Sequence, residues 1–166
     1  MKHITKNIIP IVIGVVLLGG IYLLARPQND VPVNATSFGP LTALAAAETT
    51  YDFGRISMAA GKVSHAFAVR NTGSEPVLVE KLYTSCMCTT ASLKTQEGKV
   101  GPLGMPGHGF LPSINKVIAP GEEATVEVVF DPAAHGPAGV GRIERVVFLE
   151  NAGAKLQVGF SATVTP

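Results

Sequence analysis

The first strongly patterned stretch of the chain is an uncharged hydrophobic run at residues 8–25. A helix rises 1.5 Å per residue, so a run of this length crosses roughly 27 Å of hydrocarbon. Lys2 and Lys6 precede the run, and Arg26 follows it. This charge bias predicts a signal anchor, a single transmembrane helix, over residues 1–26. We expect the N-terminus in the cytoplasm and the rest of the chain in the periplasm or at the cell exterior.

A cleaved signal peptide is the alternative interpretation of the same run. Ala45, Ala46 and Ala47 are small residues of the kind that signal peptidase accepts, but they lie too far beyond the run for an ordinary cleavage site. Residues 27–49 contain several prolines and alanines without a helical or strand period. We therefore expect a retained anchor, followed over 27–49 by a flexible linker that separates the membrane from a folded domain.

From residue 50 onward the hydrophobic period is two, which is typical of β-strands. In residues 62–70 the odd-numbered positions face one way, and a turn at 71–75 leads to a second strand at 76–83. We predict that these two strands pair as a hairpin, which would place His65 opposite Leu82. Further strands are expected near residues 51–56, 123–131, 143–150 and 155–164.

Short strands joined by Gly, Pro and Asn turns, without a clear amphipathic helix, predict an all-β fold. We expect an immunoglobulin-like β-sandwich of about seven strands over residues 50–166. Residues 93–116 are rich in glycine and proline and show no period of their own. They are expected to form one long irregular insertion, and long loops of this kind commonly carry function.

Charge and composition narrow the classes of function. The 166 residues include 13 Lys and Arg against 12 Asp and Glu, a formal net charge of +1. This balance provides no overall field for holding nucleic acid. No phosphate-binding glycine loop joins a strand to a helix, and Ser85 has no His and Asp context for nucleophilic catalysis. We therefore expect a non-catalytic protein without a nucleic-acid partner, and no small-molecule substrate is identified.

The two cysteines, Cys86 and Cys88, are the main candidates for chemistry. In an extended backbone, residues i and i+2 point the same way with Cα atoms roughly 6.6 Å apart, so both thiolates could bind one ion. A disulfide across one intervening residue would close a small strained ring. A location outside the cytoplasm nevertheless permits a disulfide, so the oxidised pair remains an alternative.

Histidines and a methionine in separate segments supply further donors. His65 lies near the predicted hairpin end from which the cysteines emerge, Met105 and His108 lie in the glycine-rich insertion, and His135 follows another strand. Each also has a packing interpretation, as a rim histidine or a core-filling methionine. If they gather at one end of the sandwich, thiolate, thioether and imidazole would suit Cu(I), and two thiolates with two imidazoles would suit Zn²⁺. We expect one copper or zinc ion.

The chain resembles the bacterial family called domain of unknown function fifteen seventy-three in three stretches, YDFGRI, VSHAFAVRNTGSEPVLVEKLYTSCMCTTASL and IAPGEEATVEVVFDP. The resemblance covers roughly residues 50–163 and implies an immunoglobulin-like fold similar to the major sperm protein. It implies no particular activity, because the family has no established one. The family usually has glycine between its cysteines, where this chain has Met87.

The leading hypothesis is a membrane-anchored, extracytoplasmic domain that binds a thiophilic metal and catalyses no reaction. One alternative is a scaffold module that binds another envelope protein, with purely structural cysteines. A thiol oxidoreductase that uses the cysteine pair is a third hypothesis. In the leading hypothesis the ligands are Cys86, Cys88, His108 and His135, with Met105 or His65 in addition.

Overall fold

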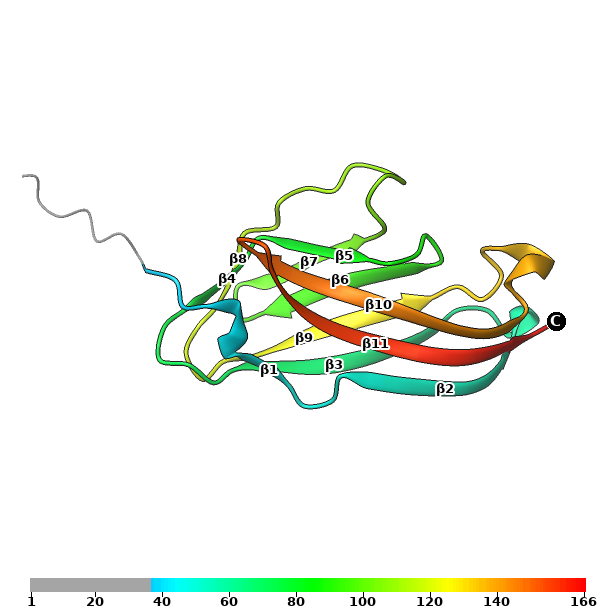
Figure 1. Cartoon of the computed structure of the whole chain (residues 1–166), viewed down its shortest axis with the longest axis horizontal. Coiled ribbons are helices and arrows are strands. Elements are labelled where there is room, and N and C mark those ends of the chain that lie inside the picture. The colour runs from blue at the N-terminus through cyan, green and yellow to red at the C-terminus, as the bar shows by residue number, and fades with distance from the viewer. Residues whose placement is uncertain (1–36) are drawn as a thin grey trace, which may run out of the picture. The chain divides into compact units, whose positions relative to one another are not determined.

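The computed structural model describes residues 37–166, and these residues form an immunoglobulin-like β-sandwich (Figure 1). In spatial order, the first sheet contains β1 (Leu44–Ala46), β3 (Val63–Asn71), β9 (Glu123–Phe130), β6 (Thr89–Thr95) and β7 (Gly98–Leu103). The second contains β2 (Thr50–Ser57), β11 (Ala154–Thr165), β10 (Gly141–Asn151) and β5 (Lys81–Thr84). A small third sheet pairs β4 (Val77–Val79) with β8 (Lys116–Ile118). Three short 3-10 helices are η1 (Leu41–Ala43), η2 (Met58–Ala60) and η3 (Gly136–Gly139).

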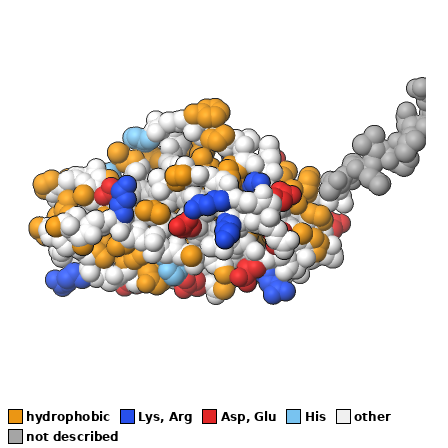
Figure 2. All heavy atoms as spheres, turned by 180° about the vertical axis from the view of Figure 1, so that it is seen from behind, with side chains coloured by type: hydrophobic (Ala, Val, Ile, Leu, Met, Phe, Trp, Pro, Cys, Tyr) orange, Lys and Arg blue, Asp and Glu red, His pale blue; other side chains and the backbone are white. Residues whose placement is uncertain are grey.

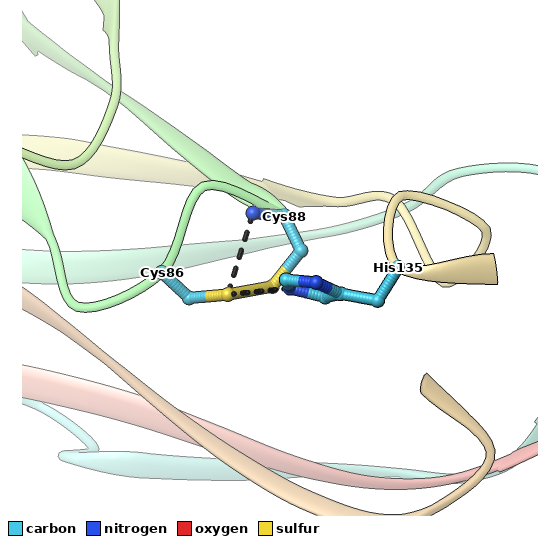
Figure 3. Close-up of side chains that lie close together, drawn as sticks. All are labelled: Cys86, Cys88 and His135. Carbon is cyan, nitrogen blue, oxygen red and sulfur yellow. Dashed lines mark hydrogen bonds between the residues drawn. A yellow bond between two sulfur atoms is a disulfide. The ribbon is translucent and has the colours of Figure 1, made fainter. Parts of the chain in front are cut away.

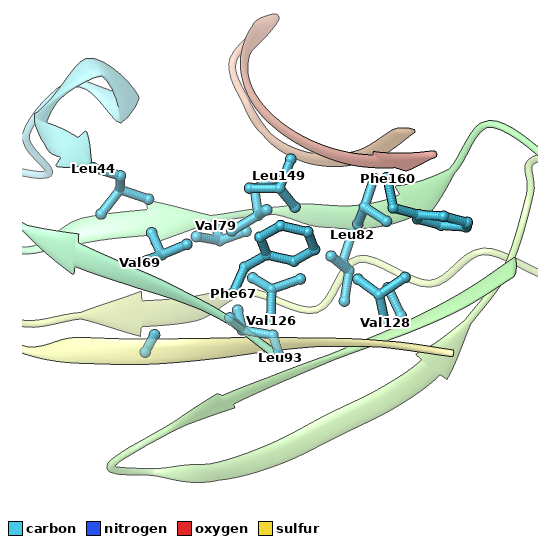
Figure 4. Close-up of a cluster of buried hydrophobic side chains, with 14 of the residues drawn as sticks. Leu44, Phe67, Val69, Val79, Leu82, Leu93, Val126, Val128, Leu149 and Phe160 are labelled. Atoms are coloured by element: carbon cyan, nitrogen blue, oxygen red, sulfur yellow. The ribbon is translucent and has the colours of Figure 1, made fainter. Parts of the chain in front are cut away.

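The hydrophobic core lies between the two main sheets (Figure 4). Along β9 the side chains alternate, with Val126 and Val128 fully buried and Glu127 between them partly exposed. This is the period-two pattern that predicted a β-sandwich, and the prediction of an all-β fold is confirmed. Each large apolar side chain buried in this way contributes roughly 1.5–3 kcal/mol to folding. On the outside, basic and acidic side chains are intermixed over the face shown in Figure 2.

The two strands that we predicted to form a hairpin lie in different sheets. His65 in β3 is paired with Val128 in β9, and Leu82 in β5 is paired with Leu149 in β10. Beyond β3 the chain therefore leaves the first sheet instead of folding back beside β3. The prediction that His65 lies opposite Leu82 is wrong.

The reason lies at Asn71, the buried last residue of β3. Its side-chain amide donates hydrogen bonds to the carbonyls of Glu75 (2.8 Å) and Ile118 (2.9 Å). Its Oδ1 accepts a hydrogen bond from the backbone N–H of Gly73 (2.9 Å). These bonds hold a turn that directs the following strand toward β8. The residues of this turn resemble those of a hairpin, but here the chain leaves the first sheet.

Residues 93–116, predicted as one irregular insertion, begin with regular structure. β6 continues to Thr95, where its partner β7 follows after a short turn, and Leu93 is fully buried in the core. Gly101 in β7 has a φ of +106°, and a Cβ there would lie 2.8 Å from the carbonyl oxygen of Ala91. The glycine that suggested a loop thus permits close approach of two strands. Residues 104–115 form the part of the segment without strands.

Part of the linker predicted over 27–49 is also folded. η1 and β1 lie within it, and Leu41 and Leu44 are only 3% and 4% exposed. Residues 37–166 contain eleven strands, against about seven expected. The additional strands are β1, the β6–β7 hairpin and β8, and the predicted second strand is divided into β4 and β5.

The predicted anchor over 1–26 lies outside the described residues. Within residues 37–166, no helix has the length and apolar character needed to cross a membrane.

Candidate functional site

Cys86, Cys88 and His135 form a cluster, called here the Cys–His cluster (Figure 3). Their two Sγ atoms and the imidazole nitrogen all lie within 4.8 Å of one another. The cysteines come from the turn between β5 and β6, and the histidine comes from the connection between β9 and β10. The cysteines are buried whereas His135 is exposed, so the cluster opens to solvent at its imidazole.

The cysteines lie in a tight turn and not in the extended backbone that we expected. The carbonyl oxygen of Cys86 accepts hydrogen bonds from the backbone N–H of Thr89 (3.2 Å) and from the hydroxyl of Thr84 (2.9 Å). The turn brings the Cα atoms of Cys86 and Cys88 to 5.3 Å, and the two sulfur atoms lie within disulfide distance. Met87 at the tip of the turn is half exposed. Such a turn suits either a disulfide or two thiolates on one ion.

His135 is positioned by the loop that follows β9. The backbone N–H of Asp131 donates to the carbonyl of Cys88 (2.9 Å), which joins this loop to the cysteine turn. The Asp131 carboxylate accepts a hydrogen bond from the backbone N–H of Ala133 (2.9 Å), an Asx turn that begins the bend. Gly136 continues the bend with a φ of +56°. As a result, Nε2 of His135 lies 3.2 Å from Sγ of Cys86.

Arg145 is a fourth residue of this site, and it was not among the residues predicted from the sequence. Its Nε donates a hydrogen bond to Sγ of Cys88 (3.3 Å), and its Nη1 donates to the carbonyl of Glu144 (2.7 Å). Arg145 belongs to β10, in which Val147 and Leu149 are fully buried. The same alternation that places these two residues inward also points Arg145 inward. An arginine at an inward-facing position of a strand is uncommon, and this was the sequence feature that could have identified Arg145 as a site residue.

Several hydrogen-bond donors surround the two sulfur atoms. Sγ of Cys86 lies 3.4 Å from the backbone N–H nitrogen of Cys88, which donates to it. Sγ of Cys88 lies 3.6 Å from the hydroxyl oxygen of Thr89 and also accepts the Arg145 hydrogen bond. When a cysteine is reduced, hydrogen-bond donors and a guanidinium near its sulfur stabilise the thiolate. The thiolate is the form of cysteine that binds metals and acts as a nucleophile.

The remaining predicted ligands lie outside the Cys–His cluster. His65 stacks on Tyr51 with ring centroids 3.7 Å apart, and its Nε2 is hydrogen-bonded to the carboxylate of Glu48. Tyr51 and Glu48 therefore hold His65 at the edge of the core. His108 is exposed and Met105 is half-buried, in the segment between β7 and β8. Of the six residues predicted as ligands, the structure brings together Cys86, Cys88 and His135.

The fold and the cluster define an immunoglobulin-like β-sandwich domain with a Cys-x-Cys turn beside a histidine and an arginine. A sequence-family profile described as "Protein of unknown function (DUF1573)" matches residues 44–104, which include both cysteines. The matched part is fewer than half of the 166 residues. No curated protein matches the chain.

Solved structures resemble the fold at low sequence identity. A protein of unknown function from Porphyromonas gingivalis W83 superposes with a TM-score of 0.52 and 16% identity, covering 81% of this chain and 51% of that one. The chain thus spans about half the length of that protein. A family 123 glycoside hydrolase from Clostridium perfringens gives a TM-score of 0.41 at 10% identity, covering 70% and 22% of the two chains. At 16% identity the likeness to the Porphyromonas gingivalis protein concerns the fold alone.

Proposed function

We propose that this domain binds one thiophilic metal ion, copper or zinc, through Cys86, Cys88 and His135. The observation that carries the proposal is the 4.8 Å span of the two sulfurs and the imidazole nitrogen. Sulfur ligands lie about 2.3 Å from zinc and histidine nitrogens about 2.0 Å, so donors of one ion are up to about 4.6 Å apart. Thiolate and imidazole are ligands that suit both Cu(I) and Zn²⁺. After reduction of the cysteines the two sulfurs would have to move apart to share one ion, and His135 already lies beside Cys86.

Metal binding by this cluster requires both cysteines in the reduced state. The two sulfurs lie within disulfide distance, so the same turn also suits an oxidised form in which neither sulfur is a thiolate. Binding of an ion and formation of the disulfide exclude each other. We therefore expect metal loading under reducing conditions and loss of the metal on oxidation.

The proposed role is binding without catalysis, in a domain held outside the cytoplasm. The Cys–His cluster contains no carboxylate that would act as a base on a metal-bound water. The hydrophobic run at residues 8–25, with Lys2 and Lys6 before it, supports attachment to a membrane with the domain on the far side. In that setting an envelope protein is the partner class that we propose for delivery or removal of the ion.

The test is metal analysis of the full-length chain, purified under anaerobic reducing conditions and dialysed against copper or zinc. We expect about one ion per chain in the unmodified protein and loss of that ion in Cys88→Ser and His135→Ala. His108→Ala is the matched control, because His108 is exposed and outside the cluster. The proposal is overturned if the reduced protein takes up no ion, or if His108→Ala and His135→Ala behave alike. An envelope scaffold would bind no ion and would tolerate Cys88→Ser.

Thiol–disulfide exchange is a second candidate, favoured by the disulfide distance between the sulfurs and by Nε2 of His135 at 3.2 Å from Cys86. The two thiols would pass two electrons and two protons to a substrate disulfide, leaving a disulfide between Cys86 and Cys88 and a substrate dithiol. The test is turnover of a disulfide substrate with dithiothreitol as the reductant. Turnover that disappears in Cys86→Ser would support this activity, and stoichiometric metal binding without turnover would exclude it.

A further inference from the structure

We infer that Arg145 makes the metal site selective for the monovalent ion Cu(I) over divalent Zn²⁺. The inference rests on the proposed metal-binding function and deepens it by naming the ion. It begins from the contact between Nε of Arg145 and Sγ of Cys88, which are 3.3 Å apart. An arginine guanidinium is a cation, so the site holds a positive charge beside one ligand.

The charge of Arg145 lies beside a cysteine sulfur. Within residues 37–166, no carboxylate forms a salt bridge with Arg145. The carboxylate of Glu144, its neighbour in sequence, pairs instead with Arg142 (3.6 Å) on the exposed side of β10. The only other hydrogen bond of the Arg145 guanidinium in the described part of the chain is to the neutral carbonyl of Glu144. In the reduced protein, a thiolate at Cys88 would therefore be the anionic group that this guanidinium contacts.

The charges of the site balance with one positive ion of unit charge. Two thiolates carry two negative charges, the imidazole ligand is neutral, and Arg145 adds one positive charge. Cu(I) makes this group neutral, whereas Zn²⁺ leaves one excess positive charge among buried sulfurs, and burial disfavours net charge. The extra charge of zinc, about 5 Å from a guanidinium in a medium of effective dielectric 20 to 40, lowers its relative affinity by at least about tenfold.

The number of ligands also favours Cu(I) over Zn²⁺. Structural zinc is almost always held by four protein ligands, and the Cys–His cluster supplies three. Two of the three are soft thiolates, which suit Cu(I). Arg145, which lies beside Cys88, is a cation and supplies no fourth ligand. The charge and the donor set thus favour the same ion.

The experiment measures both affinities in the full-length reduced chain under anaerobic conditions. Competition with bathocuproine disulfonate reports Cu(I), and competition with 4-(2-pyridylazo)resorcinol reports Zn²⁺. In Arg145→Met we expect the ratio of the two affinities to shift toward zinc by about tenfold or more. Arg145→Lys keeps the charge and should leave the ratio within about threefold. Arg142→Met is the matched control, because it removes the same charge from an exposed side chain on the same strand.

The outcomes separate the inference from the function on which it rests. An unchanged ratio in Arg145→Met, with both ions still bound by the unmodified protein, overturns the inference and leaves metal binding intact. An equal shift in Arg142→Met also overturns it, because the effect would then come from net charge alone. Failure of the unmodified reduced protein to bind either ion overturns the proposed function itself. Arg145→Gln serves the same comparison if the methionine variant does not fold.

Discussion

The backbone N–H of Asp131 donates a hydrogen bond to the carbonyl oxygen of Cys88 over 2.9 Å. The bond joins the end of β9 to the turn between β5 and β6, so two segments far apart in the sequence share one hydrogen-bonded edge. The loop that continues from Asp131 then carries His135 to 3.2 Å from Cys86. The Cys–His cluster is therefore assembled by backbone pairing, and the side chain of Asp131 shapes the loop that completes it.

Asp131→Ala should weaken the proposed metal binding by about tenfold, while Asp131→Asn should bind almost as the unmodified protein does. The alanine variant loses the acceptor for the Ala133 N–H, which begins the bend toward His135, and asparagine keeps that acceptor. Unfolding in urea should show a loss of only about 0.5–1.5 kcal/mol for the alanine variant. Equal weakening in both variants would instead implicate the charge of Asp131, which faces Lys62 at 3.9 Å.

Leu93→Ala and Phe110→Ala should differ sharply in stability, although both residues lie in the segment predicted as an insertion. Leu93 is fully buried in β6, so truncation should cost about 2–5 kcal/mol of unfolding free energy. Phe110 is 91% exposed, and its truncation should change stability by less than about 0.5 kcal/mol. Urea denaturation of both variants checks this. Similar values for the two would place Leu93 outside the core.

Asn71→Ala should destabilise the domain by about 2–3 kcal/mol, because it removes the donors to two carbonyls and the acceptor for Gly73. Asn71→Asp keeps the shape and the acceptor but turns a carboxylate oxygen toward those carbonyls, so it should be at least as damaging at neutral pH. Ser74→Ala, at an exposed position of the same turn, is the control. A mild Asn71→Asp phenotype would show that the amide donors contribute little.

Tyr83→Phe should reduce stability at neutral pH and have a diminishing effect in acid. The hydrogen bond from Tyr83 to Glu150 (2.6 Å), followed by Lys81, holds the pKa of Glu150 below its ordinary value of 4.5. A lowered carboxyl pKa stabilises the fold above the unfolded-state value, and that contribution is lost as the pH falls through the folded-state value. Urea denaturation from pH 7 downward should show the difference shrinking below about pH 4.5.

The matched control for Tyr83 is Tyr51→Phe. It deletes the same hydroxyl from a ring that stacks on His65 and makes an edge contact with Phe53. Because no carboxylate bond is removed there, its effect on stability should not vary over the same pH range. A constant difference between Tyr83→Phe and the unmodified protein at all pH values would contradict the assigned role of Glu150.

The strand pattern of the domain was predictable because alternation is a local property. Val126 and Val128 are separated by one partly exposed residue, and each inward residue is recognisable from its own neighbours. The strand β7 was missed for a physical reason, since the positive φ of Gly101 and its close approach to Ala91 make a glycine necessary inside a strand. The crossing between sheets after Asn71 was missed because it depends on the hydrogen bond from Asn71 to Ile118. Ile118 is distant in sequence, so the residues of the turn do not indicate this bond.

The amino-acid sequence alone determined that this domain is a β-sandwich and that Cys86 and Cys88 lie close together, because hydrophobic period and short-range spacing are local features of the chain. Only the tertiary structure decided that His135 and Arg145 join them while His65 stays with Glu48. The reason is that the order of strands across a sheet depends on pairing between distant segments. Which loops meet at one end follows from that order, and local pattern does not contain it.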